Sequence, residues 1–504
     1  MKEKKRKKAA KRQAALQRRL AHKDFTSPSQ PLLGNQPIHY ELADRTRVIS
    51  MGGLGALHTL VTKLHLPELL NDQVSVLKRH LPYWESDHIL SPCYNILTGG
   101  KPLQDINRLR RDEGYLEALG VDRLPAPCTT GDFLRRFETE APLVAFQEAI
   151  NQARPPVWQR LPVEQRSLAI LDLDGTIVPT TGECKQGMDY CSYKKQWGYG
   201  PLLISLAQTG EVLYVVNRPA SAPSHQGAAA WVKRALPHVQ AAFKTIWLRG
   251  DTDFSLTKEF DGWEEDGVMF IFGYDAHAAL IEQAEALPGR DWQRLARPPQ
   301  YEVKTQPRTK PDHVKQEIVE QRGFERIETV GEEVASFFYR PTACKNPYRL
   351  IVLRKQLEIT QGGEWCRDEL VYFFYITNDW MSPTPDLVLF YDERGGQEHL
   401  IGQLKNTIPV FHAPTDTLEA NWAYMIIAAL AWNLKVWYGL LLDEPALQQQ
   451  IQRMSFKAFL ERFIHVPCQI LTSGHRLIYR IVQFTTDTLT VLSTFEQLLA
   501  LRFP

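Results

Sequence analysis

Acidic side chains follow two of the apolar runs in this sequence, at the point where each run ends. The run SLAILDLD (167–174) ends in Asp172 and Asp174, and the run TIWLRGD (245–251) ends in Asp251. Carboxylates gathered at strand ends can bind divalent metal ions, and two such ions can hold the attacking and leaving oxygens of a phosphoryl transfer. Asp also occurs at strand ends and helix caps for purely local reasons. Taken alone, each of the two acidic sites is therefore better explained by a structural role.

A third acid lies in the segment YDERGGQEHLIGQLK (391–405), together with an aromatic hydroxyl and two cations. On a single helix, one face within an arc of roughly 60° would carry Tyr391, Arg394, Glu398 and Lys405. A metal-binding carboxylate beside cations that bind phosphates would suit a polyanionic substrate. The alternative is an exposed helix with Glu–Lys pairs, although Gly395-Gly396 is unfavourable in such a helix.

The elements that must position these acids follow from hydrophobic periodicity. We expect a strand over 167–174, two strands around a turn at Thr209-Gly210, and then helix and strand in alternation up to about residue 287. A doubly wound parallel sheet needs a helical crossover after its first strand, and this order lacks one. The pattern therefore predicts a mixed sheet, preceded by helical residues 48–150 and followed by a strand-rich stretch over 290–385.

Charge is distributed unevenly along the chain. Residues 1–23 hold eleven Lys and Arg against one Glu, although the net charge of the whole chain is +1. Such a basic arm suits a polyanionic partner or is simply a solvated tail. The apolar segment 423–442 is long enough to span a bilayer, but Asn433 and Lys435 near its middle favour a buried core helix, and we expect no membrane association.

Read alone, the D-x-D-G-T sequence at 172–176 resembles the first motif of haloacid-dehalogenase-type phosphatases. In that chemistry Asp172 would attack phosphorus, and Asp174 would act as the acid and base. This interpretation leaves the 391–405 segment, the basic arm and roughly 170 preceding residues without a role.

All the motifs together resemble those of bacterial insertion-sequence DDE transposases of the cut-and-paste type. The Y-x2-R-x3-E-x6-K spacing of 391–405 is the signature of a large group of these enzymes. The D-x-T of 174–176 resembles their first acid motif, and LRGDTDF resembles the second, with Thr252 where Ser is usual. His399 stands where the subgroup often has Asn, and the likeness runs from about residue 38 to about 440.

The resemblance implies an α/β fold with a ribonuclease H-like mixed-sheet core, a strand-rich insertion and a helical N-terminal domain. It implies a catalytic two-metal site of Asp174, Asp251 and Glu398 that binds Mg²⁺, with Mn²⁺ as a substitute, and it leaves Asp172 as an alternative first acid. It also implies the residues that bind DNA: Tyr391, Arg394 and Lys405.

The activity implied is DNA transposition: binding of terminal inverted repeats, metal-dependent strand cleavage and transfer of the freed 3′ end to target DNA. A homodimer acting on paired ends, in the bacterial cytoplasm at the nucleoid, belongs to the same expectation. A catalytically idle, DNA-binding descendant is a further alternative, but all three acids are present.

The expected division of the chain combines these patterns. We predict a basic arm and linker, a helical DNA-binding domain, a catalytic core in two parts around the insertion, and a C-terminal region for dimerisation or DNA contact. The boundaries are 1–37, 38–160, 161–289, 290–385, 386–445 and 446–504.

Overall fold

The computed structural model describes most of the chain. The described residues are 46–180, 185–297, 326–361, 364–474, 476–482, 485 and 487–503, with Tyr40 and scattered positions from 3 to 18, and only the backbone of 326–330 and 358–369. The arm and linker expected over 1–37 thus lie outside the described residues, apart from those scattered positions. Two compact units are present. Unit 1 comprises Met1–Pro162, Val178–Met188 and Gly402–Pro504, and unit 2 comprises Val163–Ile177 and Asp189–Ile401.

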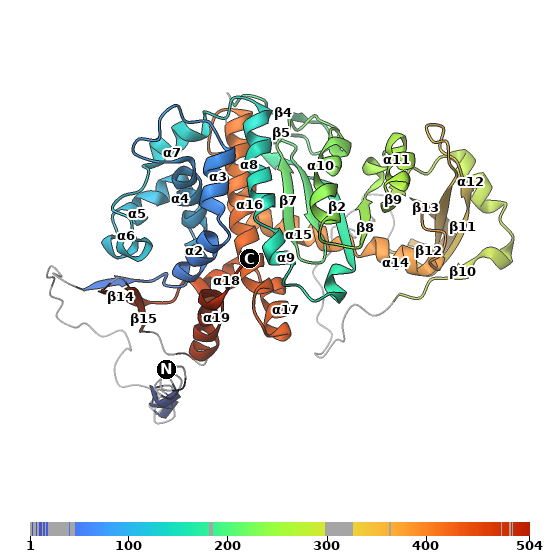
Figure 1. Cartoon of the computed structure of the whole chain (residues 1–504). Helices are drawn as coiled ribbons and strands as arrows, with labels where there is room; N and C mark the ends of the chain where they lie inside the picture. The colour runs from blue at the N-terminus through green and yellow to red at the C-terminus, as the bar shows by residue number, and fades with distance from the viewer. Residues whose placement is uncertain are drawn as a thin grey trace. The chain divides into compact units, whose positions relative to one another are not determined.

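Unit 1 is mainly helical and is built around one long helix, α16 (Leu418–Leu440), drawn in orange in Figure 1. Every residue from Ala420 to Leu440 is buried, because α4, α7, α8 and α17 pack around it. This agrees with the expected core helix, and among the described residues no helix is both long and apolar enough to cross a membrane. The N-terminal helices of the unit are α2 (Leu54–Lys63), α3 (Leu66–Gln73), α4 (Glu85–Leu97), α5 (Ile106–Arg110), α6 (Glu113–Leu119), α7 (Pro127–Leu134), α8 (Glu140–Gln152) and α9 (Pro155–Trp158).

The C-terminal part of unit 1 adds three helices and a small sheet. Strands β14 and β15 pair with each other, and β1 completes the three-stranded antiparallel sheet through β14. Their bounds, with those of the helices and of the short strand β3, are β1 (Arg47–Ile49), β3 (Val178–Pro179), α17 (Pro445–Arg453), α18 (Phe456–Phe459), β14 (Cys468–Ser473), β15 (Arg476–Ile481) and α19 (Thr488–Ala500).

A short break separates two helices in the N-terminal part of unit 1. α7 ends at Leu134 and α8 begins at Glu140. Pro142 supplies a physical reason, because a proline lacks the N–H that a helix interior needs and is tolerated only in the first turn. The helix therefore restarts just ahead of it.

Unit 2 is organised by a nine-stranded mixed sheet, which confirms the predicted sheet type. Its strand order is β10-β11-β12-β13-β9-β8-β2-β6-β7. Strand β8 runs parallel to β2 and to β9, whereas β6 is antiparallel to both β2 and β7. These strands are β2 (Leu168–Gly175), β6 (Leu202–Leu206), β7 (Glu211–Val216), β8 (Thr245–Gly250) and β9 (Met269–Tyr274), and a separate hairpin is formed by β4 (Asp189–Cys191) and β5 (Gln196–Tyr199).

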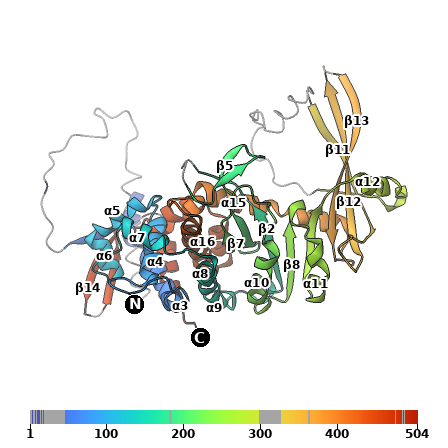
Figure 2. The same cartoon turned by 90° about the horizontal axis from the view of Figure 1, so that it is seen from above.

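The strand-rich stretch after β9 continues the same sheet. Three strands of 14 residues each pair antiparallel and lie side by side in Figure 2. The third of them pairs antiparallel with β9, so that Phe374 lies opposite Tyr274. The strands are β10 (Gln293–Arg294), β11 (Arg326–Tyr339), β12 (Tyr348–Gln361) and β13 (Glu364–Thr377).

Helices flank this sheet and fix its faces. α10 packs on β6, β7 and β8, where Trp231 lies against Tyr214. α14 packs through Leu387 and Val388 into an apolar core that includes Ile351 of β12. The helices of unit 2 are α10 (Ala228–Gln240), α11 (Phe260–Glu265), α12 (Ala278–Glu285), α14 (Thr384–Asp392) and α15 (Gly395–Asn406), the last of which continues beyond Ile401 into unit 1.

Candidate active site

The first acidic motif lies on β2, between β8 and β6 in the sheet of unit 2. Asp172 and Asp174 are two residues apart on this strand, so their side chains leave the same face of the sheet. Asp174 lies opposite Leu203 of β6, near the end of β2. Only 15% of the Asp174 side chain is exposed, against 2% for Asp172. Asp174 is therefore the more accessible of the two acids.

The second motif follows β8, the parallel neighbour of β2. Asp251 is the residue directly after this strand, and its carboxylate accepts a hydrogen bond from the backbone N–H of Asp253 at 3.1 Å. Because Leu173 lies beside Gly250 in the register, Asp174 and Asp251 end neighbouring strands at the same edge of the sheet. The parallel pairing thus brings two of the predicted acids together.

The third motif is not one helix, contrary to the sequence expectation. α14 ends at Asp392, α15 begins at Gly395, and Glu393 and Arg394 form a turn between them. The low helix propensity of Gly395 and Gly396 accounts for an interruption at this point. Tyr391 therefore belongs to α14, whereas Glu398 belongs to α15.

Arg394, in this turn, lies between two of the predicted acids. Its Nη1 is 3.8 Å from Oδ2 of Asp174, and its Nη2 is 3.7 Å from Oε1 of Glu398. The guanidinium is mostly buried, with 17% of the side chain exposed, whereas 68% of the Glu398 side chain is exposed. One cation thus faces carboxylates that come from a strand and a helix more than 200 residues apart in the sequence.

The electrostatic state of the acids reflects this crowding. Burial raises the pKa of Asp174 to about 6; the charges of Asp251 and Glu398 add to the rise, and Arg394 opposes it. Burial also raises the pKa of Asp251, again against the effect of Arg394. Three carboxylates share a single guanidinium, so the ionised site carries excess negative charge and favours a further cation.

Sequence reasoning missed Arg249, which the structure places beside Asp172. Its Nε and Nη2 donate to the two carboxylate oxygens of Asp172 at 2.6 and 3.0 Å, and its Nη1 donates to the backbone carbonyl of Phe390 in α14. Both side chains of this ion pair are 2% exposed. Arg249 thereby joins β2, β8 and α14, the elements that carry or precede the predicted acids.

Gln397 is the second residue that sequence reasoning missed. Its amide donates to the backbone carbonyl of Asp172 at 2.9 Å and to Oγ of Ser205 at 3.3 Å, and the side chain is buried. It directly precedes Glu398, so these bonds hold the start of α15 against β2. The R-x-D spacing of Arg249 and Asp251 was a usable signal for the first residue, since alternate strand positions share a face. A lone Gln gave no such signal.

Tyr391 is packed tightly rather than open to solvent. Its ring lies 4.6 Å from that of Tyr375, centroid to centroid, and Arg394 stacks 5.8 Å from the centre of the Tyr391 ring. Gly273 of β9 makes room for it, because a Cβ there would lie 3.0 Å from the Tyr391 hydroxyl and 2.8 Å from Oγ1 of Thr252. The hydroxyl thus approaches the backbone of β9 closely.

Lys405 lies further along α15 than Glu398. It is exposed near the end of α15, seven residues and roughly 10 Å along the helix axis beyond Glu398, in the part of the helix that belongs to unit 1. Within the described part of the chain, no three His, Cys, Asp or Glu side chains are gathered closely enough to form a ready metal site.

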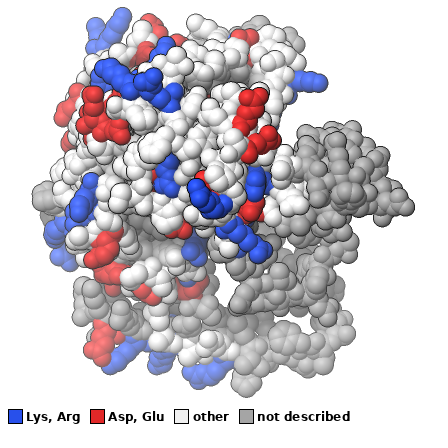
Figure 3. All heavy atoms as spheres, turned by 90° about the vertical axis from the view of Figure 1, so that its right-hand side faces the viewer, with Lys and Arg blue, Asp and Glu red and all other residues white. Residues whose placement is uncertain are grey.

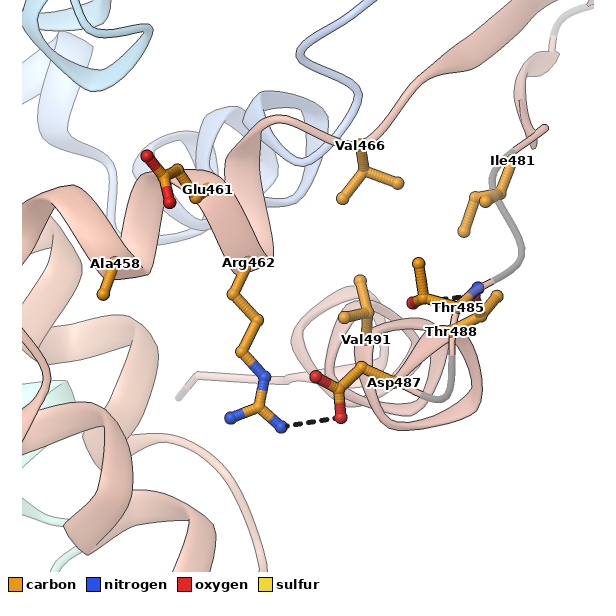
Figure 4. Close-up of a pocket in the computed structure, with 9 residues that line it drawn as sticks. All are labelled: Ala458, Glu461, Arg462, Val466, Ile481, Thr485, Asp487, Thr488 and Val491. Atoms are coloured by element: carbon orange, nitrogen blue, oxygen red, sulfur yellow. Dashed lines mark hydrogen bonds and ion pairs between the residues drawn. The ribbon is translucent and has the colours of Figure 1, made fainter. Parts of the chain in front are cut away.

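Two cavities of unit 1 are lined by none of the predicted acids. One of about 330 Å³ lies between α18, β15 and the start of α19. Figure 4 shows Arg462 donating to Asp487 across it, at 3.0 Å. This pair satisfies its own charges, and none of the predicted acids lines the cavity.

Comparison with known proteins finds matches among solved structures. No curated protein matches the chain. Among solved structures, a cryo-EM structure of a piggyBac transposase synaptic complex with hairpin DNA is 9% identical, with a TM-score of 0.38, over 92% of this chain and 89% of that one.

A family comparison covers nearly the whole sequence. The family described as "Transposase DDE domain group 1" matches residues 32–502. This range includes all of unit 2, most of unit 1 and all the acids described above. The chain belongs to the transposase family defined by this DDE domain.

Proposed function

We propose that the chain is an active cut-and-paste DNA transposase whose metal-binding acids are Asp174, Asp251 and Glu398. The observation that carries this proposal is the position of Arg394, within 4 Å of both Asp174 and Glu398, where the charge of Asp251 also acts on Asp174. Two acids from separate segments thus face one cation, and the charge of Asp251 acts on the same guanidinium. Carboxylates that lie far apart on the surface would interact only weakly, because salt screens exposed charges from one another.

The donor chemistry fits divalent metal ions. All three side chains offer carboxylate oxygens, the ligands that Mg²⁺ and Mn²⁺ prefer, and the site has excess negative charge. A pair of bound Mg²⁺ ions would supply activation of water and stabilisation of charge on the phosphate oxygens. Asp174 and Asp251 would hold the metal from the strand ends, and Glu398 from α15.

The remaining residues of the 391–405 segment would act on the DNA backbone. Arg394 can donate to a phosphate through the guanidinium edge that now faces the acids, and Tyr391 would orient it by stacking. Lys405 would contact a phosphate further along the strand. The substrates proposed are terminal inverted repeats and target DNA, bound by a homodimer, with cleavage followed by attack of the freed 3′-hydroxyl on target DNA.

We also propose a ribonuclease H-like core. Its support is the order β7-β6-β2-β8-β9, in which a first strand is flanked by an antiparallel hairpin on one side and two parallel strands on the other. In the same proposal, residues 38–160 and the basic arm help to grip DNA, residues 290–385 are the insertion, and residues 446–504 serve dimerisation or DNA contact.

The phosphatase alternative requires Asp172 to attack phosphorus. Both oxygens of Asp172 accept hydrogen bonds from Arg249, and its side chain is 2% exposed, which argues against a nucleophile that must meet a substrate in line. The idle-transposase alternative is disfavoured because all three acids are present and two of them face Arg394.

The test uses the DNA that flanks the coding gene, cloned on both sides of a marker. We expect wild-type protein with Mg²⁺ to cut at the ends, and Asp174→Asn, Asp251→Asn and Glu398→Gln each to abolish cutting while binding the same DNA. Asp253→Asn, an exposed acid beside Asp251, is the matched control that should cut normally. Hydrolysis of small phosphate esters that is lost in Asp172→Asn but kept in Glu398→Gln would refute the proposal.

A further inference from the structure

The β4–β5 hairpin of unit 2 exposes large aromatic rings. The exposed fraction is 83% for Tyr193, 53% for Trp197 and 43% for Tyr190. Tyr190 and Trp197 are cross-strand partners whose ring centroids lie 5.7 Å apart. Aromatic side chains are normally buried, so a group of exposed rings marks a surface that is covered by something else.

The same hairpin is basic at its tip. Lys194 and Lys195 are both exposed and form the turn, where Lys195 has a positive φ of 51°. The Lys194 ammonium lies 4.8 Å from the centre of the Tyr193 ring. The acid of the hairpin, Asp189, lies at its base and accepts a hydrogen bond from Ser221. Rings interleaved with cations match a strand of nucleic acid, whose bases stack and whose phosphates are negative.

The base of the hairpin is held firmly. Gly200 donates its N–H to the carbonyl of Arg218 at 2.7 Å, and Nε of the buried Arg218 donates back to the carbonyl of Gly200 at 2.9 Å. Ala220 donates its N–H to the carbonyl of Gly198 at 3.3 Å. Figure 2 shows β5 projecting away from β2 and β7. The exposed rings are therefore carried by a fixed element rather than by a loose loop.

The hairpin leaves the sheet at the edge that carries the acids. Thr176 donates its N–H to the carbonyl of Pro201 at 3.0 Å, and Leu203, two residues later, lies opposite Asp174. From Leu203 back to the turn at Lys195 is eight residues, or at most roughly 26 Å of extended chain. At 3.4 Å per base pair, this reach corresponds to about eight base pairs from a phosphate at Asp174.

We propose that the β4–β5 hairpin binds unpaired nucleotides beside the cleavage site, with Tyr193 and Trp197 stacking on bases and the two lysines contacting phosphates. This rests on the proposed function, since it takes DNA as the substrate. Unpaired bases are required because the faces of paired bases are already covered within the duplex. On the face seen in Figure 3, basic and acidic side chains of the described residues are interspersed, so the part of that face that is described shows no separate basic patch.

The test measures binding of the full-length protein to two labelled DNA probes of equal length. One probe is a fully paired duplex, and the other contains a short mismatched bubble. Wild-type protein should prefer the bubble, and Tyr193→Ala and Trp197→Ala should each weaken bubble binding about five- to hundredfold, as expected for one lost stacked base. Trp197→Phe should retain most of the preference, and binding to the paired probe should change little.

Two further variants distinguish the effect of base stacking from that of charge, and from the effect of removing any exposed aromatic side chain. Lys194→Gln should reduce the slope of log affinity against log salt by about 0.7 on the bubble. Phe338→Ala is the matched control, because Phe338 is 75% exposed and stacked on Trp380 but lies on β11, with four strands between it and β2. It should leave the preference unchanged.

The outcomes distinguish this proposal from the one it rests on. Binding of both probes with no preference, or a preference that survives Tyr193→Ala and Trp197→Ala, overturns the hairpin assignment and leaves the transposase proposal standing. Loss of self-association in these variants with intact DNA affinity also overturns it, because the surface would then be a protein interface. Failure of the wild-type protein to bind either probe refutes the proposed function itself.

Discussion

Replacing Asp174 by Asn should stabilise unit 2 at neutral pH in the absence of divalent metal. The change keeps the shape of the side chain and removes a charge that is partly buried beside two other acids. Burial raises the pKa of Asp174 from 3.8 to about 6, with the charges of Asp251 and Glu398 adding to the rise. The native fold therefore disfavours the ionised form, which is also the form that would bind metal.

The pH dependence and magnitude follow from this difference in pKa. Because the folded protein holds the Asp174 proton more tightly than the unfolded chain, the group contributes stability that is fully present below about pH 3.8 and lost as the pH rises through about 6. About two pKa units at roughly 1.4 kcal/mol each give about 3 kcal/mol. Asn has no such dependence, so the stability of Asp174→Asn relative to wild type should rise by about 3 kcal/mol across this window.

The assay compares melting temperatures of the two proteins with a chelator present, at pH 4 and at pH 7.5. The melting temperature of Asp174→Asn minus that of wild type should be larger by roughly 5 °C at pH 7.5 than at pH 4. Asp266→Asn, an exposed acid after α11, is the control and should show a constant gap. A constant gap for Asp174→Asn as well would refute the reasoning. Adding Mg²⁺ should then stabilise wild type and leave Asp174→Asn unaffected, if Asp174 holds metal.

Three further changes test other parts of the site. Arg249→Met should lower the free energy of unfolding by about 3–5 kcal/mol in denaturant titrations, because it leaves buried Asp172 unpaired, and Asp172→Leu in the same chain should restore most of the loss. Gly273→Ala should lower the free energy of unfolding by about 1–3 kcal/mol and displace Tyr391. The folded variant should therefore cut DNA more slowly than wild type, and a rate equal to that of wild type would contradict the close packing. Lys405→Gln should reduce the slope of log affinity against log salt for duplex DNA by about 0.9, without changing the single-turnover cutting rate of bound DNA.

Local patterns predicted the mixed sheet, since a hairpin after the first strand and alternating helix and strand afterwards leave few topologies. They also predicted acids at the ends of two strands, and the structure brings Asp174 and Asp251 to one edge of the sheet because β2 and β8 are parallel neighbours; the choice of Asp174 over Asp172 came from the family resemblance. The prediction of one continuous helix over 391–405 was wrong. It relied on residue spacing, and the low helix propensity of Gly395 and Gly396 was not allowed to interrupt the helix. The pairing of β13 with β9 depends on contacts between strands about 100 residues apart, which no short pattern encodes.

Both compact units are discontinuous in the sequence, and this determines the fate of incomplete chains. The core of unit 1 is built around α16, and the third predicted acid of unit 2 is Glu398. Both lie after residue 397 in the sequence. A gene copy with a stop codon or frameshift before that point encodes neither a folded helical unit nor a complete set of acids. Decayed copies of the gene should therefore yield degraded protein rather than stable fragments that compete with the intact protein for its DNA.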